Sequence, residues 1–422
     1  MTIRTIPVQA GHFVETRSRG YLIYLVVFLG SVALMDGYIS GIKSSAIPSI
    51  LKEYGISAPA FSGLEALVLI PTFFIFAFNS LADVIGRRLT ILLLVLGLGL
   101  SCLAILLWTP TLPWFLVFYA AATFFTVSNL WTVPASEEAP AVPRARLVAL
   151  VYVIGQLPLT ALLPPLLVGK LGLDWRWMYG IQFLIMLPVL VLWLPMRETG
   201  RYTAMAAERR QNPGQRRHPF GLGAIDRRDR RYIALSAAVA TCLLIFMVLY
   251  FWAGYFFMTL RGYTLTEWSR ILLAVMIFLL VGGLTGGWVL DFVGRRRGLV
   301  IACLGMAVCV SGVGYLPDPW PAVLLALTAF FVGIASTWTN VYIPEVFPTE
   351  RRATCTGWVS SIARIAYVAG PALAAVLLKI FPTMTGFWVA AGLVILIPIG
   401  IVLLVQPAET RKQDLEEIEL LR

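Results

Sequence analysis

The chain has 422 residues, of which 59% are hydrophobic and 13% are charged, and its mean hydropathy is +0.84. Soluble domains carry roughly 25% charged residues, so this composition excludes an ordinary soluble domain and is typical of a multi-pass membrane protein. The net charge of +11 does not indicate nucleic-acid binding, because its placement follows the membrane topology.

Apolar stretches of about 20 residues, the length that crosses hydrocarbon as a helix, follow one another along the chain. A polar segment at 1–20 precedes them. The predicted spans are 21–42, 61–81, 89–108, 114–136, 147–169, 177–196, 232–258, 268–290, 298–316, 321–344, 354–379 and 385–405. The expected fold is therefore all-α, with twelve spans in two six-helix bundles at 21–196 and 232–405. A basic linker at 197–231 joins the bundles, and a tail follows at 406–422.

The basic residues predict the orientation of these spans. With a cytoplasmic N-terminus, 25 of the 33 Lys and Arg fall in cytoplasmic segments and seven fall outside. Positive loops stay in the cytoplasm, so both termini are expected there, in the inner or plasma membrane of the cell. The expected partners are the lipid bilayer, a small-molecule substrate and protons. Nucleic acid is not expected, and a monomer suffices.

Two loop motifs occur twice in the chain, each at an offset of 208 residues. LADVIGRRL after the second span matches VLDFVGRRR after the eighth, and EEAPAVPRAR after the fourth matches EVFPTERRA after the tenth. Two separate motifs that share one offset indicate an internal repeat of six spans running in the same direction.

The repeated loops are predicted to form cytoplasmic gates. A glycine between an acid and an arginine pair allows a tight turn between antiparallel helices, and the acids and arginines are candidates for ion pairs between helix ends. The alternative for the arginines is plain topogenic charge. The gate residues are Asp83, Gly86, Arg87, Glu137 and Arg144, and in the second half Asp291, Gly294, Arg295, Glu345 and Arg352.

These loops resemble the D-x-x-G-R-[RK] signature of the major facilitator superfamily, and the resemblance covers nearly the whole chain. PEVFPTERRATCTG resembles a segment of its sugar-porter and organic-acid branches, and MDGYISGIKSSAIPSILKEYGI is similar to the first span of aromatic-acid and niacin-type proton symporters. The resemblance implies two six-helix bundles around one central site that opens alternately to each side.

Ionisable residues inside spans are functional candidates, because an ionised group at mid-bilayer costs roughly 2.5–3.5 kcal/mol on insertion scales. Asp36 shares a helix face with Ser40 and Lys43. Burial favours the neutral form of a carboxyl group, so Asp36 is a candidate for proton coupling; a static partner on another helix is the alternative. Glu65 is a second candidate, although its place near the outer end of its span also fits contact with headgroups. Lys43 is expected to extend outward.

Arg364 lies within the eleventh span, and its repeat equivalent is Gln156. Arginine stays charged in proteins and binds carboxylates through two hydrogen bonds, so Arg364 is a candidate anion site or a counter-ion of Asp36. Amides and aromatic rings in other spans are further candidates, with packing as the alternative for the aromatic residues. The predicted substrate-binding residues are Arg364, Gln156, Asn129, Trp252, Tyr255, Trp338, Asn340 and Tyr367.

No ATP-binding loop, catalytic cluster or metal-binding spacing appears in the sequence, so we expect neither an enzyme nor a cofactor. The favoured interpretation is a secondary active transporter that imports a small organic acid with protons by alternating access. A sugar or polyol transporter is the main alternative. Proton-coupled drug efflux is disfavoured by the absence of a G-P-x-x-G-G stretch in the fifth span, and a non-transporting receptor is disfavoured by the intact gate motifs.

Overall fold

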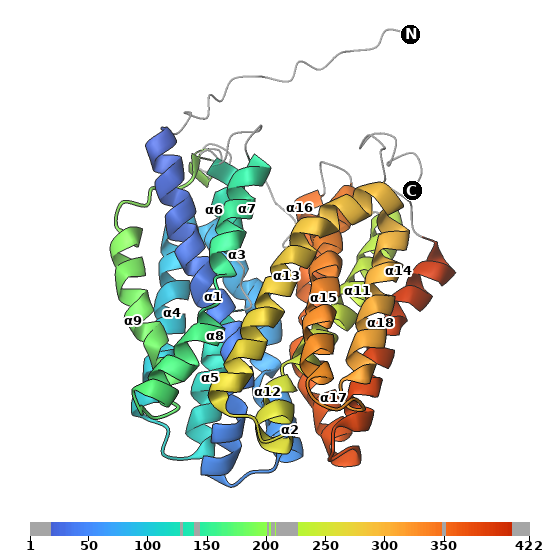
Figure 1. Ribbon diagram of the computed structural model, residues 1–422. Helices are drawn as coiled ribbons and strands as arrows, with labels where there is room; N and C mark the ends of the chain where they lie inside the picture. The colour runs from blue at the N-terminus through green and yellow to red at the C-terminus, as the bar shows by residue number, and fades with distance from the viewer. Residues whose placement is uncertain are drawn as a thin grey trace.

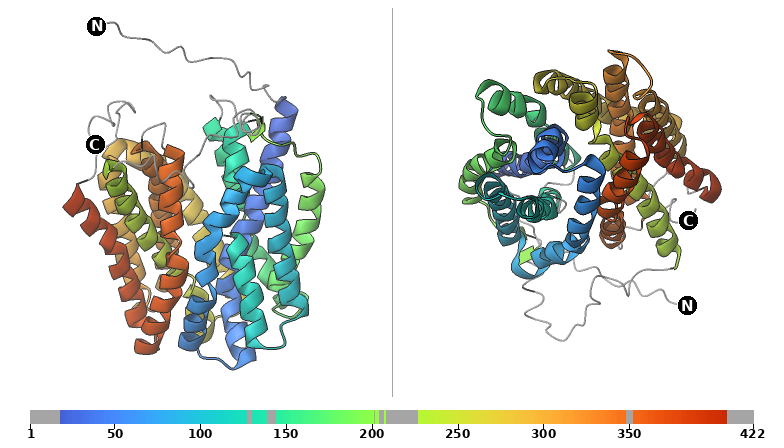
Figure 2. Two further views of the ribbon diagram at one scale, coloured as in Figure 1. Left: turned by 180° about the vertical axis from the view of Figure 1, so that it is seen from behind. Right: turned by 90° about the horizontal axis from the view of Figure 1, so that it is seen from below.

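The computed structural model describes residues 18–126, 130–138, 144–200, 202–203, 207, 227–347 and 352–406, and all regular structure in these residues is helical. Two groups of helices lie side by side, coloured blue to green and yellow to red in Figures 1 and 2. We call them the N-terminal and the C-terminal group.

The N-terminal group contains α-helices, one 3-10 helix (η1) and one π-helix (η2). Its elements are α1 (Arg19–Tyr54), α2 (Ala58–Val68), η1 (Ile70–Phe74), α3 (Ile75–Ile85), α4 (Arg87–Leu107), α5 (Leu112–Thr126), α6 (Thr132–Glu138), α7 (Arg144–Gly155), α8 (Leu159–Pro164), η2 (Pro165–Lys170) and α9 (Trp177–Trp193).

The C-terminal group contains α-helices and a second π-helix (η4). Its elements are α11 (Arg227–Tyr250), α12 (Ala253–Tyr255), η4 (Phe256–Leu260), α13 (Leu265–Val293), α14 (Arg295–Gly312), α15 (Trp320–Glu345), α16 (Arg352–Ala363), α17 (Ala366–Ile380) and α18 (Thr385–Val405).

Local chemistry explains where several helices begin and end. The Ser18 side chain accepts the backbone N–H of Tyr21 and so caps the start of α1, whereas Gly55 ends this helix in the left-handed conformation at φ 59°. At the start of α13, the side chains of Thr264 and Glu267 each accept the other's backbone N–H in a capping box. These caps satisfy backbone groups that have no partner within the helix.

Large apolar side chains cover much of the outer surface, as hydrocarbon requires. Trp288, Phe292 and Leu404 are each more than 80% exposed. Within the described residues, nine helices are long and apolar enough to cross a membrane, and α5 and α9 are shorter apolar helices. The count of twelve spans stays a prediction.

The two groups meet mainly at one end of the molecule, which we call the closed end. There α2 packs along α17, α8 and η2 pack along α13, and α1 packs against α12 (Figure 1). The Ser62 hydroxyl donates to the Pro371 carbonyl at 2.8 Å, and the Trp268 indole donates to the Ser45 hydroxyl at 3.1 Å. An added Cβ at Gly254 would lie 1.7 Å from the Ser44 carbonyl oxygen, so only glycine permits this approach of α12 to α1.

Candidate functional site

Two adjoining cavities share Met247, Val332 and Ser336 in their walls; the first lies between the two groups, and the second is lined by the C-terminal group alone. Their volumes are about 320 and 330 Å³. The first is lined by polar side chains of α1, α8 and the break before α8, which are Asp36, Ser40, Ser44, Gln156 and Thr160. The second is lined by Asn340, Thr356, Ser360, Arg364 and Tyr367. Because the two cavities share three wall residues, we treat them as one central site, to which the N-terminal group contributes only in the first cavity.

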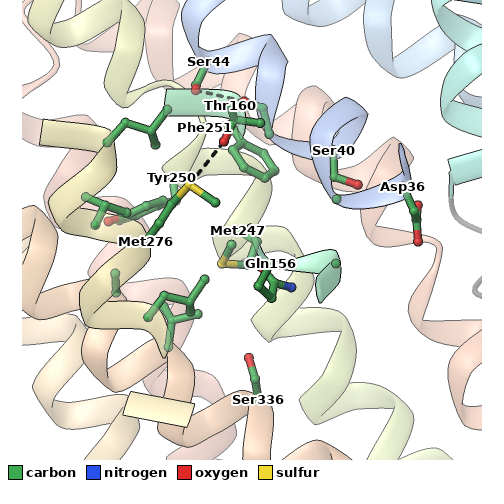
Figure 3. A pocket seen from close by; sticks show the side chains of 18 of the residues that line it. Asp36, Ser40, Ser44, Gln156, Thr160, Met247, Tyr250, Phe251, Met276 and Ser336 are labelled. Atoms are coloured by element: carbon green, nitrogen blue, oxygen red, sulfur yellow. Dashed lines mark hydrogen bonds between the residues drawn. The ribbon is translucent and has the colours of Figure 1, made fainter. Parts of the chain in front are cut away.

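Asp36 presents a carboxylate with spare hydrogen-bonding capacity to the first cavity. Its Oδ2 accepts the indole N–H of Trp131 at 3.1 Å. Its Oδ1 is buried and has no hydrogen-bond partner within the described part of the chain. Figure 3 shows Asp36 and Ser40 on neighbouring turns of α1 at the edge of the cavity. An incompletely satisfied buried carboxylate is costly when ionised, so this position suits a group that takes up a proton.

Arg364 supplies the cation of the second cavity. It is 7% exposed, and its side chain makes no hydrogen bond or ion pair with the residues that the structure describes. It interacts electrostatically with both Asp36 and Tyr367. A buried guanidinium without a bonded carboxylate is an incomplete site, and an anionic ligand would complete it.

Both halves interrupt a helix at the repeat positions of these polar groups. α7 ends at Gly155, directly before Gln156, and Pro158 stands before α8. α16 ends at Ala363, directly before Arg364, and α17 begins at Ala366. Interrupted helices free backbone groups near a site, a feature of transporters that bind substrate at the membrane midplane. Gln156 and Arg364 therefore occupy equivalent places on opposite sides of the central site.

Aromatic rings make up much of the first cavity wall. Its lining includes Trp131, Tyr152, Tyr250, Phe251 and Trp268. The Tyr250 hydroxyl is anchored to the Leu325 carbonyl at 2.6 Å, so that ring is held in place. A cavity of about 150 Å³ is enough to hold benzene, so these walls leave room for a ring with polar substituents. Sequence reasoning did not assign these residues to the site, because aromatic residues in spans more often pack or face the interface.

Several predicted substrate residues lie away from the two cavities. Trp252 and Trp338 are fully buried, and their indole N–H groups have no hydrogen-bond partner among the described residues. Tyr255 packs edge-on against Trp252 with ring centroids 5.7 Å apart, and Trp338 stacks on Tyr342 at 4.7 Å. Neither Trp252, Trp338 nor Tyr255 lines the central cavities. Asn129 lies outside the described residues.

Lys43 does not extend outward as expected; it is buried and paired with Glu65. Its Nζ lies 2.6 Å from both carboxylate oxygens, and the Tyr119 hydroxyl donates to Oε1 of Glu65 at 2.7 Å. Lys43 and Glu65 are only 5% and 1% exposed. The outward expectation was wrong because Glu65 on α2 offers the ammonium group a nearer partner than the headgroups.

The first gate motif closes a turn around Gly86, whose φ of 102° favours glycine. Nε and Nη2 of Arg87 contact Glu137 at 3.3 and 3.1 Å, and Nη1 donates to the Ala82 carbonyl at 2.7 Å. The Glu198 carboxylate accepts the backbone N–H groups of Arg87 and Arg88 at 2.9 and 3.3 Å, which places an anion at the N-terminus of α4.

The second gate motif repeats this geometry in the C-terminal group. Gly294 has a φ of 104°, and Nε and Nη2 of Arg295 contact Glu345 at 3.3 and 3.1 Å, the same distances as in the first half. Asp291 accepts from Nη1 of Arg295 at 2.6 Å. The side chains of Asp83, Arg144 and Arg352 are outside the described part of the structure. The repeat read from the sequence is thus present in three dimensions.

The sequence profile of the Major Facilitator Superfamily matches residues 26–334 and 265–421 of the chain. NiaP of Bacillus subtilis, named for niacin/nicotinamide transport, is 23% identical over 361 residues, which cover 81% of this chain and 84% of that protein. A gallate transporter of Pseudomonas putida is 22% identical over 418 residues, which cover 89% and 90%.

Solved structures share the fold. The xylose transporter XylE of E. coli in an inward-open conformation superposes with a TM-score of 0.72 at 18% identity, over 95% of this chain and 99% of that one. A bacterial homologue of the human lysosomal transporter Spinster gives a TM-score of 0.66 at 14% identity, over 92% and 98%. The profile match, the repeated gate loops and the paired helix groups lead to one conclusion: this chain is a membrane transporter of the major facilitator superfamily.

Proposed function

We propose that this chain is a secondary active transporter that imports a small aromatic carboxylate together with a proton. We further propose that twelve spans cross the membrane, with α5 continuing into α6 and with α9 and α14 as the shorter crossings. Both termini are then cytoplasmic, and the bundles occupy 21–196 and 232–405, joined by 197–231. The cluster of basic residues in that linker supports this orientation.

The single observation that carries the proposal is one carboxylate and one guanidinium in one central site, without an ion pair joining them. Asp36 holds a buried oxygen without a hydrogen-bond partner in the described chain, and the Arg364 side chain makes no hydrogen bond to a described residue. A substrate carboxylate would satisfy Arg364 through two charge-assisted hydrogen bonds. A proton would neutralise Asp36, which costs less than burying a second anion in the site.

The aromatic wall supports a planar ring as the rest of the substrate. Trp131, Tyr250, Phe251 and Trp268 line the first cavity, while its uncharged polar groups are Ser and Thr hydroxyls and one amide, that of Gln156. Rings stack on planar ligands and supply large contact area at low entropic cost. Niacin and gallate, which give two of the relatives their names, are both aromatic carboxylic acids.

In the proposed transport cycle, the proton and the substrate carboxylate bind on the outer side and are both released on the inner side. Asp36 takes a proton and Arg364 takes the substrate carboxylate while the site is open outward. Closing the α2–α17 and α8–α13 contacts then turns the site inward, where Asp36 releases the proton and the substrate leaves. One proton and one carboxylate enter in each cycle, so no net charge moves.

The test is uptake into proteoliposomes that contain the full chain, with and without an inward proton gradient. The panel comprises benzoate, nicotinate, acetate, xylose and a primary amine. We expect gradient-dependent uptake of the aromatic carboxylates and little uptake of xylose or the amine. Arg364→Ala should lose carboxylate affinity, whereas uptake of xylose by the parent chain would favour the sugar alternative and overturn the proposal.

A further inference from the structure

A second charged cluster lies outside the central site, between α1, α2 and α5. Lys43 Nζ contacts both oxygens of Glu65 at 2.6 Å, and the Tyr119 hydroxyl completes the set at 2.7 Å. All three residues belong to the N-terminal group and are less than 10% exposed. The cluster lines neither central cavity.

The C-terminal group covers this cluster. Trp252 lies just before α12, is fully buried, and places its ring centroid 5.7 Å from Lys43 Nζ. Next to it, Gly254 approaches the Ser44 backbone so closely that a Cβ would clash. One residue further along α1, Ser45 accepts from Trp268 of α13. The lid over the ion pair is therefore made by the group that must move away when the closed end opens.

We propose that the neutrality of the Lys43–Glu65 pair, capped by Trp252, is what lets the closed end close, and we call this capped pair the lock. In the proposed orientation the closed end faces outward, so it is the outer end of the transporter. The pair is internal to the N-terminal group, but its burial depends on the C-terminal group. Paired charges tolerate the dry, closed state, whereas a single remaining charge favours the hydrated, open state. The neutrality of the pair thus allows the outer end to close.

This inference rests on alternating access as proposed above, but on neither the substrate nor the proton. Asp36 and Arg364 belong to the central site, and the lock residues do not touch it. A conformational measurement without substrate and without a gradient therefore tests the lock separately. Its failure would leave the proposed import intact, and the failure of import would leave the lock intact.

The test measures how readily the closed end opens. Ser62 faces the Pro371 carbonyl across the two groups and is fully buried. In Ser62→Cys, a nearly isosteric change, a membrane-impermeant thiol reagent added outside reports opening. The parent chain with its five native cysteines provides the background rate. We expect Lys43→Met and Glu65→Gln each to raise the labelling rate about tenfold, because each leaves one partner without its counterpart.

The matched control is the double variant Lys43→Met/Glu65→Gln, which removes both charges. Its rate should return to within about twofold of the rate of Ser62→Cys alone, because a neutral replacement of a buried pair is tolerated. Single variants that label at the parental rate, or a double variant as fast as the singles, would overturn the lock.

If the single variants do not reach the membrane, Trp252→Leu tests the same idea without leaving an unpaired charge. Removing the cap lets water reach the pair, so labelling should rise. A rate equal to that of Ser62→Cys alone would reject the assignment.

Discussion

The substitution Asp36→Asn tests the proton site most directly. The amide keeps the size of the side chain and an oxygen for the Trp131 indole, which donates at 3.1 Å in the parent. The amide cannot take up and release a proton, which is the one role that we assign to the Asp36 side chain. We expect the variant to fold, to bind carboxylate, and to lose accumulation driven by a proton gradient.

The magnitude follows from the charges of the site. One proton with one carboxylate is electroneutral, so each unit of pH difference should give about tenfold accumulation. A membrane potential of about 100 mV contributes about 2.3 kcal/mol for each net charge moved, or about fiftyfold. The parent should therefore follow the pH gradient and ignore the potential. In Asp36→Asn the ratio of inner to outer carboxylate should fall to about one.

The assay is nicotinate uptake into proteoliposomes in which a pH gradient and a potassium-diffusion potential are imposed separately. Exchange of labelled for unlabelled nicotinate without any gradient checks that the variant still carries substrate. Asp318→Asn is a control, since Asp318 pairs with Arg261 in an exposed position far from the cavities. Full accumulation by Asp36→Asn, or accumulation by the parent on potential alone, would refute the reasoning.

Three further predictions concern binding, stability and closure. Arg364→Ala should weaken nicotinate binding by at least roughly 10- to 150-fold, since each of the two hydrogen bonds to the carboxylate contributes about 1.5–3 kcal/mol. Binding of nicotinamide should change little, and equal losses for both ligands in a calorimetric titration would count against a carboxylate site. Arg87→Met should lower the apparent Tm in detergent more than Arg295→Met does. The reason is that the Glu137 side chain left without its arginine is 7% exposed, whereas that of Glu345 is 25% exposed. The reverse order in a thermal melt would be inconsistent with this burial argument. Gly254→Ala should abolish uptake and raise the rate at which an outside thiol reagent labels Ser62→Cys, because the added Cβ keeps the closed end from closing. Gly283→Ala, whose added Cβ meets nothing within 4 Å, should change neither uptake nor labelling. Normal uptake by Gly254→Ala would disprove the close approach.

Much of the fold follows from patterns along the chain. Apolar length predicts the membrane-crossing helices, and the offset of 208 residues predicts the paired gates, because both signals are local or repeat at fixed spacing. Gly86 and Gly294 adopt nearly the same positive φ, and Arg87 and Arg295 contact the glutamates 50 residues further on at the same distances. The ion pairs expected between helix ends are present at these places, and the role of these residues as cytoplasmic gates stays a prediction.

The details of the site depend on which helix faces meet, and one sequence does not contain that information. Lys43 and Glu65 are 22 residues apart on different helices, and Trp131 reaches Asp36 across 95 residues. No spacing predicts either contact. The break at Gln156 has a signal in Pro158, but the break at Arg364 has no proline beside it, so only the repeat relates the two. Trp252 and Trp338 are aromatic residues of the kind that line binding sites, yet they pack outside the cavities.

The closed end has a consequence for the speed of the transport cycle. The Lys43–Glu65 pair at the closed end lies within one group, as do the gate pairs Arg87–Glu137 and Arg295–Glu345, so each pair stays together when the groups move apart. The hydrogen bonds that join the groups there, such as Ser62 to Pro371, are neutral and contribute about 1 kcal/mol each. Opening therefore separates no opposite charges at these places. The rate of opening, and with it turnover, should therefore respond weakly to ionic strength.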